Sequence, residues 1–199
     1  VRGVLQAMYY PELKFASAEE PSVVKMYEIM KSGGLPGGED LLNLVKYADE
    51  LGMIETKQGQ GEYAGLTIIN YSRTTDASGL WEKLPTLRHF RGLIIDSSGN
   101  VVARPFEKTH KAGVEISLEE LNIVPEKVFE KANGSMGITY FWNGKWRVST
   151  KFSFENDAFT KPAQELLDKM NQEKMDPSKT YLFEIILPNE AHVVDYGNE

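Results

Sequence analysis

The chain has 199 residues, of which 41% are hydrophobic, so it can form one domain of ordinary size or two small ones around a substantial core. It contains no cysteine, which excludes disulfides and thiolate zinc sites and makes a reducing, cytoplasmic setting the simplest expectation. The net charge of -7 argues against a surface coated for nucleic acid, although residues 82–161 carry 12 Lys or Arg against 10 Asp or Glu.

The first predicted elements are two helices. Residues 21–31 begin with a proline and carry apolar side chains at helical spacing. Residues 39–51 follow a Gly- and Pro-rich breaker at 32–38 and also carry apolar side chains at helical spacing. The glycines that follow, Gly59, Gly61 and Gly65, do not have the spacing of a phosphate-binding loop, so we assign them to an ordinary loop. Residues 1–65 are therefore predicted to form an N-terminal helical layer.

From residue 66 onward the pattern becomes strand-like. Two hairpins are predicted, one around Ser97-Ser98-Gly99-Asn100 and one around Asn143-Gly144. A helix is predicted over 157–174, with Leu166, Leu167 and Met170 packing inward. The predicted strands are 66–71, 92–96, 101–106, 127–130, 137–142, 145–152, 181–187 and 192–196. The sum is an α+β domain rich in antiparallel strands over 66–199.

Lys131 is the candidate nucleophile. It is expected at the tip of a strand, and it is followed by the turn-forming residues Asn133, Gly134 and Ser135, which would hold its amine at the border of a cavity. At pH 7 only about one free lysine amine in a few thousand is neutral, so a nucleophilic lysine needs neighbouring cations that disfavour its charged form. An ordinary solvated surface lysine is the alternative interpretation.

Cations and one unusual carboxylate accompany Lys131 in the sequence. Arg91, Lys108 and Lys151 each stand at or near the end of a predicted strand, where they could bind a triphosphate and act on the lysine. Glu184 interrupts the apolar run Leu182-Phe183-Glu184-Ile185-Ile186, and a carboxylate there must be paired or accept hydrogen bonds. A structural salt bridge at Glu184 is the competing explanation.

The order of these motifs is similar to that of a known family. Arg91-Gly92, Arg104-Pro105-Phe106-Glu107-Lys108, Lys131-Ala132-Asn133-Gly134-Ser135, Lys151 and Phe183-Glu184 resemble the motifs of ATP-dependent RNA ligases of the phage RNA ligase 1 type. The resemblance implies a nucleotidyltransferase (ATP-grasp-like) fold and a reaction that uses ATP and Mg²⁺ to join 5′-phosphate and 3′-hydroxyl RNA ends. It also implies that Glu184 contacts the ribose and that Gly134 lets the backbone approach the phosphate. For Phe106 and Phe152 we expect core packing, with a wall for the adenine as the alternative.

This sequence differs from the family motifs in three ways, and these differences change the function that we expect. Asn133 replaces an aspartate, and this residue and the stretch 191–196 resemble plant and fungal tRNA ligases instead. Thr109-His110 replaces an aromatic pair, and two later motifs, a Glu-Gly strand and a Lys-x-Lys strand, are not found. We therefore expect a fragment that adenylates weakly alone, with a tRNA ligase-type repair or splicing enzyme and a non-catalytic nucleotide- or RNA-binding module as alternatives.

Overall fold

The computed structural model describes residues 21–109, 117, 127, 129–156 and 158–187, and this part of the chain opens with two helices. Helix α3 spans Pro21–Ser32 and helix α4 spans Gly38–Glu50, which confirms both predicted helices. The buried residues of α4 all lie on one side: Leu41, Leu44, Val45 and Ala48. Their spacing gives the helix an apolar stripe, and burial of that stripe holds the helix against the sheet beneath it.

The first sheet is antiparallel and has the strand order β1-β2-β3-β4. The strands are β1 (Ile54–Gln58), β2 (Leu66–Tyr71), β3 (Arg91–Asp96) and β4 (Val101–Ala103). Strand β1 was not predicted, and it pairs with β2 along its whole length. The predicted helical layer over 1–65 therefore also supplies a strand to the sheet of the following region.

The hairpin between β3 and β4 is confirmed, with a shorter second strand than expected. The carboxylate of Asp96 accepts hydrogen bonds from the backbone N–H groups of Ser98 at 2.8 Å and Asn100 at 2.9 Å. This local closure by an aspartate is typical of tight turns. Strand β4 ends at Ala103, so the predicted strand over 101–106 becomes an irregular segment from Arg104 onward.

The second sheet is also antiparallel, with the order β6-β5-β7. Its strands are β5 (Ser135–Trp142), β6 (Lys145–Thr150) and β7 (Tyr181–Ile185). The turn between β5 and β6 has φ values of 49° at Asn143 and 75° at Gly144. Two successive positive φ values are the geometry for which Asn-Gly is preferred in hairpins. The predicted hairpin at this position is confirmed.

Several predicted details are wrong. Lys127, Phe129 and Glu130 are not in a strand, so Lys131 does not stand at a strand tip. Helix α7 spans Thr160–Lys169 only, and of the three residues predicted to pack inward, Leu167 is buried while Leu166 and Met170 are 65% and 61% exposed. The buried residues of α7 are Thr160, Ala163 and Leu167, which are spaced as one row along the helix. The predicted strand 192–196 lies outside the described residues.

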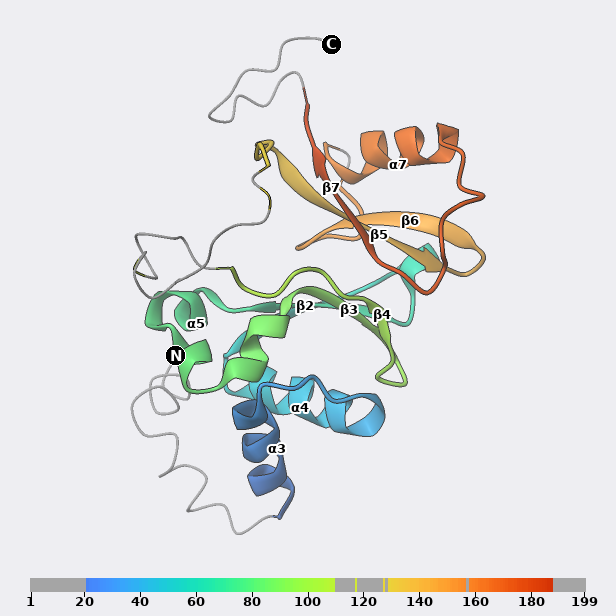
Figure 1. Cartoon of the computed structure of the whole chain (residues 1–199). Helices are drawn as coiled ribbons and strands as arrows, with labels where there is room; N and C mark the ends of the chain where they lie inside the picture. The colour runs from blue at the N-terminus through green and yellow to red at the C-terminus, as the bar shows by residue number, and fades with distance from the viewer. Residues whose placement is uncertain (1–20, 110–116, 118–126, 128, 157, 188–199) are drawn as a thin grey trace.

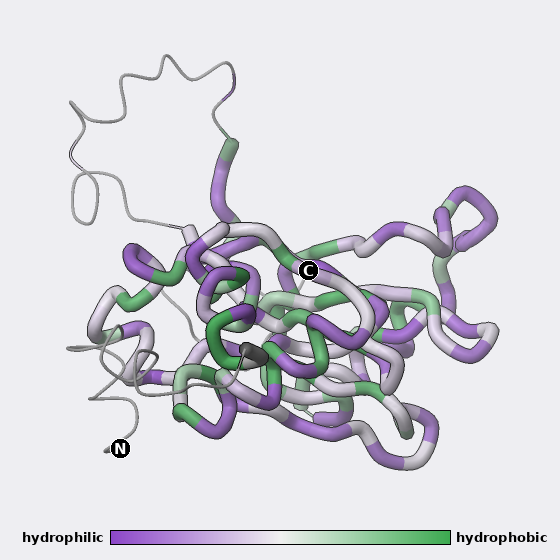
Figure 2. The backbone as a smooth tube through the Cα atoms, turned by 90° about the horizontal axis from the view of Figure 1, so that it is seen from below, coloured by the Kyte–Doolittle hydropathy of each residue, from purple (hydrophilic) through white to green (hydrophobic). Residues whose placement is uncertain are grey.

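The elements form four layers: α3 with α4, the first sheet, the second sheet, and α7 (Figure 1). One core fills the space between the helices and the first sheet, and Ile69, Leu93 and Ile95 face it. The opposite face of the same strands carries Ile68 and Ile94 into the core between the sheets. This is the period-two alternation of a sheet covered on both faces. Along the chain, hydrophobic and hydrophilic stretches accordingly alternate instead of forming separate blocks (Figure 2).

The observed architecture is α+β, with helices flanking two antiparallel sheets, as predicted. Within the ranges that the structure describes, none of the helices has the length and apolar character needed to cross a lipid bilayer.

Candidate functional site

A cavity of about 710 Å³ opens where the start of β5, the end of β6 and strand β7 meet β3. Its walls include five of the six residues that the sequence singled out: Arg91, Lys131, Gly134, Lys151 and Glu184. These residues are up to 93 positions apart in the chain, counting from Arg91 to Glu184, and the pairing of β5 with both β6 and β7 brings the segments of Gly134, Lys151 and Glu184 together. The sixth residue, Lys108, is not part of the wall.

Lys151 is held at the cavity by a tight turn that directly follows β6. The hydroxyl of Thr150 accepts a hydrogen bond from the backbone N–H of Ser153 at 3.1 Å, and the N–H of Thr150 donates to the Ser153 carbonyl at 3.0 Å. The Lys151 carbonyl in turn accepts a hydrogen bond from the side chain of Asn70 in β2. The backbone of Lys151 is therefore fixed by both sheets, and its side chain lines the cavity with the amine 4.6 Å from the centre of the Phe152 ring.

The electrostatic surroundings of Lys151 are positive. Partial burial lowers the pKa of its amine below the ordinary value of 10.5, and the positive charges of Arg91 and Lys108 lower this pKa further, while Asp76 opposes them. Burial and like charge both disfavour the protonated amine. The same positive field favours an anion in the cavity, because a bound anion would relieve the repulsion among the three cations.

Lys108 acts on the site from a neighbouring position. Its ammonium lies 3.4 Å from the carboxylate of Asp76 and 5.0 Å from the centre of the Trp81 ring. Asp76 belongs to the short helix α5 (Arg73–Ser78), which Ser72 caps by accepting a hydrogen bond from the Thr75 N–H at 3.2 Å. The side chain of Lys108 is 15% exposed. The structure thus places Lys108 close enough to influence Lys151, with its charge shared with Asp76.

Glu184 and Gly134 are direct partners. The carboxylate of Glu184 accepts a hydrogen bond from the backbone N–H of Gly134 at 2.8 Å, which satisfies an acidic group in an apolar strand. A Cβ atom on Gly134 would lie 2.3 Å from the carbonyl oxygen of Ile185, so only glycine allows this approach of β7. Close packing between strands therefore explains this glycine without reference to a phosphate.

Lys131 borders the cavity as an exposed side chain in an irregular segment before β5. Its amine donates hydrogen bonds to the carbonyl of Ala132 at 3.2 Å and to the side-chain oxygen of Asn133 at 3.1 Å. Asn133, the residue that departs from the family pattern, thus contacts the candidate nucleophile directly. Lys131 lines the same cavity as Arg91, Lys151 and Glu184, and the predicted strand that should carry it is not found.

Aromatic rings supply the apolar part of the cavity. Phe106 and Phe152 line it with 68% and 56% of their surface exposed, so core packing, the role expected for both, is wrong. Phe183 also lines the cavity, and its ring lies against Gly137, where a Cβ would be only 2.6 Å from the ring. Exposed aromatic rings next to cations suit a ligand with a flat base and an anionic tail.

Sequence reasoning missed two contributors to the site. Asp76, which modulates the cations, lies on a helix whose sequence signals were Ser72 as N-cap and Gly79 as a left-handed C-cap with φ of 60°. Phe183 lies in the apolar run 181–187 that was predicted as a strand, and its ring packs against Gly137, which has no side chain. Neither signal says that Asp76 pairs with a cation of the site or that Phe183 lines the cavity.

Within the described ranges, no group of three His, Asp or Glu side chains is arranged to hold a metal ion. Glu184 is the one carboxylate among the described residues of the cavity wall. Neither a scan against protein-family models nor a search of curated proteins finds a match for this chain. Functional interpretation therefore depends on the residues of this cavity.

Proposed function

We propose that this chain is the nucleotide-binding part of an ATP-dependent RNA ligase with a nucleotidyltransferase fold, in which Lys131 becomes covalently adenylated. The observation that carries the proposal is the shared cavity. It holds the candidate nucleophile, two of the three predicted cations, the predicted carboxylate and three exposed phenyl rings. A volume of about 710 Å³ also lies within the range of roughly 300–1,000 Å³ that is usual for small-molecule sites.

In the proposed reaction, the amine nitrogen of Lys131 attacks the α-phosphorus of ATP. A nitrogen–phosphorus bond forms, the bond to the bridging oxygen breaks, pyrophosphate leaves and the amine loses a proton to solvent. The AMP then passes to the 5′-phosphate of an RNA strand. Finally, a 3′-hydroxyl attacks that phosphate and displaces AMP, which joins the two strands.

The contacts of Lys131 are compatible with this role. A neutral amine has two N–H donors and one lone pair, and the oxygens of Ala132 and Asn133 would take both donors and leave the lone pair for the phosphorus. Arg91 and Lys151 would bind the phosphates and stabilise the charge that develops on the leaving group. Burial is the main cause of the depressed pKa of Lys151, and the charges of Arg91 and Lys108 add to it, which is the positive surrounding that this task requires.

We expect Mg²⁺ to enter this cavity together with the nucleotide. When Mg²⁺ is bound with a nucleotide, it neutralises the charge of the leaving pyrophosphate. In nucleotide sites this ion is usually held by one or two carboxylates together with phosphate oxygens and water. Since Glu184 is the one carboxylate among the described wall residues, we expect the phosphates to supply most of its ligands.

The decisive experiment is intact mass spectrometry after incubation with ATP and Mg²⁺, followed by peptide mapping. We expect a gain of one AMP on Lys131, lost in Lys131→Met and retained in Lys127→Met, an exposed lysine four residues earlier. Parallel incubation with GTP tests the choice of nucleotide. An adduct that maps to Lys151 would refute the assignment of the nucleophile. Nucleotide binding without any adduct would refute the ligase and favour the non-catalytic module.

A further inference from the structure

A second cavity, of about 550 Å³, lies between α7 and β7. Its walls are almost entirely apolar, with Ala163, Leu167 and Met170 contributed by α7 and Leu182 and Ile185 contributed by β7. The volume is within the range of roughly 300–1,000 Å³ that is usual for small-molecule sites. We refer to this space as the α7 cavity.

Helix α7 is attached to one edge of the second sheet, and the cavity lies toward the other edge. The side chain of Gln164 accepts a hydrogen bond from the backbone N–H of Val148 at 3.0 Å and donates one to the carbonyl of Trp146 at 3.0 Å, both in β6. Strand β7 is at the opposite end of the order β6-β5-β7. Leu166 and Met170, which line the cavity and are largely exposed, therefore mark its mouth.

Thr139 brings a hydroxyl group without a hydrogen-bond partner to this cavity. The residue lies in β5, is 1% exposed and lines the α7 cavity. Its neighbours Ile138 and Tyr140 face the core between the sheets, so the alternation of the strand turns Thr139 toward α7. Within the described residues, its hydroxyl oxygen has no hydrogen-bond partner.

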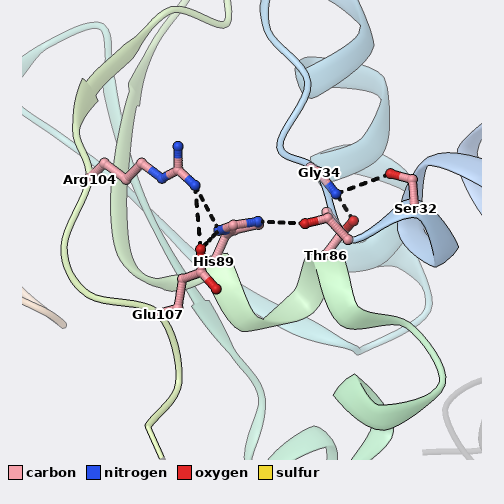
Figure 3. A network of polar contacts seen from close by, with 7 residues as sticks. Ser32, Gly34, Thr86, His89, Arg104 and Glu107 are labelled. Atoms are coloured by element: carbon pink, nitrogen blue, oxygen red, sulfur yellow. Dashed lines mark hydrogen bonds and ion pairs between the residues drawn. The ribbon is translucent and has the colours of Figure 1, made fainter.

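Buried polar side chains elsewhere in the fold show what a satisfied group looks like. The hydroxyl of Thr86, which is fully buried, lies 2.8 Å from the carbonyl of Ile29 and 2.9 Å from that of Gly34 (Figure 3). In the same network the Nε2 of His89 lies 2.9 Å from the carbonyl of Gly33. A buried polar group without a partner is costly and rare in native proteins, so the hydroxyl of Thr139 calls for a partner from outside the chain.

A water molecule is poorly suited to be that partner. A buried water typically makes about three hydrogen bonds, and two other polar groups of the wall are already bonded within the protein. The hydroxyl of Tyr181 accepts from the N–H of Asp176 at 2.8 Å, and the carboxylate of Glu184 accepts from the N–H of Gly134 at 2.8 Å. An apolar molecule with a polar end group would both bond the hydroxyl and fill the cavity.

The charge of the wall restricts that end group. Glu184 is the one charged residue among the described residues of this wall, so an anionic end group would be buried without a cation. We propose that the α7 cavity binds an uncharged apolar molecule whose single hydroxyl or carbonyl group contacts the hydroxyl of Thr139. Burial of the apolar part against α7 and β7 supplies the affinity, and the contact with Thr139 sets the orientation.

This site is separate from the nucleotide cavity, although the two have a common wall. Leu182, Phe183 and Glu184 line both cavities, so β7 forms the partition between them. The proposal does not depend on the ligase function proposed above, and AMP transfer to Lys131 has no bearing on it. Each proposal can therefore fail alone.

The test is a titration of the whole chain with 1-octanol, followed by NMR of ¹³C-labelled methionine methyl groups. Met170 and Met175 line the α7 cavity, Met136 lines the nucleotide cavity, and Met53 lies in the core next to α4. We expect saturable shifts of Met170 and Met175, with Met53 unchanged. Octanoate at neutral pH should bind roughly tenfold more weakly, because its charge has no cation in the wall. Shifts confined to Met136 would overturn the proposal.

Thr139→Val tests the contact with the hydroxyl, because valine keeps the shape of threonine. The unliganded variant should melt at a higher temperature than the parent chain, since it no longer buries an unpaired hydroxyl. Its affinity for 1-octanol should fall by roughly 2- to 12-fold, the scale of one hydrogen bond. Leu166→Gln, at an exposed position of the mouth, should fold normally and also bind 1-octanol more weakly. Val24→Gln, at an exposed apolar position of α3, is its matched control and should bind as the parent does.

Three further results would overturn the proposal. They are the absence of saturable shifts at Met170 and Met175, an unchanged affinity in Thr139→Val, and a lower melting temperature in that variant, which would reveal a partner for the hydroxyl within the chain. Binding of 1-octanol that appears only on dilution would show that a second copy of the chain covers the cavity. Binding that appears only after removal of residues 188–199 would show that the chain itself covers it. Either of these results also refutes the proposal.

Discussion

Gly92 of β3 lies directly against the backbone of Lys151. A Cβ at Gly92 would be 2.9 Å from the Cβ and 3.0 Å from the Cα of Lys151, and 2.8 Å from a methyl group of Ile138. Gly92 also has a φ of 83°, a conformation that L side chains rarely adopt. The two sheets therefore meet at a glycine beside the cavity, and the position of Lys151 depends on this contact.

Gly92→Ala should destabilise the protein in two ways, by unfavourable φ and by steric overlap. We expect a loss of about 2–5 kcal/mol in the free energy of unfolding, the sum of roughly 1–2 for the backbone and 1–3 for overpacking. Gly65→Ala is the matched control, because Gly65 has a φ of 87° with nothing within 4 Å of the added Cβ. Urea unfolding of both variants measures the difference, and equal losses would show that the contact with Lys151 is unimportant.

Lys151→Met should stabilise the fold at neutral pH. Because the folded-state pKa of Lys151 is lowered, the unfolded chain binds more protons between that pKa and 10.5, so stability rises with pH across this alkaline window. Below the window both states are protonated and the partly buried charge opposes folding. Urea titrations at pH 7 and pH 10 should show a higher stability at pH 7 and a smaller rise toward pH 10 in the variant. Lys83→Met, an exposed lysine, should change neither value.

Replacements of Glu184 separate its charge from its hydrogen bond. Glu184→Gln keeps an oxygen for the Gly134 N–H, so we expect near-normal stability and any loss of nucleotide binding to report the charge. Glu184→Leu leaves that N–H without its acceptor and should cost about 1–3 kcal/mol of unfolding free energy. Thermal and urea unfolding of the pair measure this difference. Equal stability of the two variants would mean that the hydrogen bond contributes nothing.

Phe152→Ala should weaken nucleotide binding if an exposed ring stacks on the base. A stacking contact contributes about 0.5–1.5 kcal/mol beyond area burial, so the dissociation constant for ATP should rise by roughly 2- to 12-fold. Phe129→Ala is the control, because Phe129 is 79% exposed and does not line the cavity. Isothermal titration calorimetry of both variants tests the prediction, and an unchanged affinity in Phe152→Ala would remove this ring from the binding site.

Local signals in the sequence predicted those parts of the fold that local geometry decides. Asn143-Gly144 specified its hairpin because both residues must adopt positive φ. Strand β1 was missed because, of Ile54, Glu55, Thr56, Lys57 and Gln58, only the first is buried, and its pairing with β2 is the information that makes it a strand. Leu166 and Met170 were wrongly predicted to be buried, because helical spacing does not reveal how much of the helix surface the sheet covers.

The sequence predicted which residues line the cavity, and it did not predict how their side chains are arranged. The order of the motifs identified five members of one cavity wall, while the location of Lys108 beside Asp76 depends on a helix that carries no sign of the site in its own sequence. Hydrogen-bond partners such as Gly134 with Glu184 are set by strand register, and register is a property of the folded sheet.

The cavity has walls from both sheets, with Arg91 on one and Glu184 on the other. A compound that binds the folded cavity and not the unfolded chain raises the melting temperature with its own concentration, whichever wall it contacts. Contacts with both walls add to its affinity, so at equal concentration a compound that spans the gap should give the larger shift. Thermal shift across triphosphate, monophosphate and nucleoside ligands therefore ranks which groups contribute to binding, without any turnover being required.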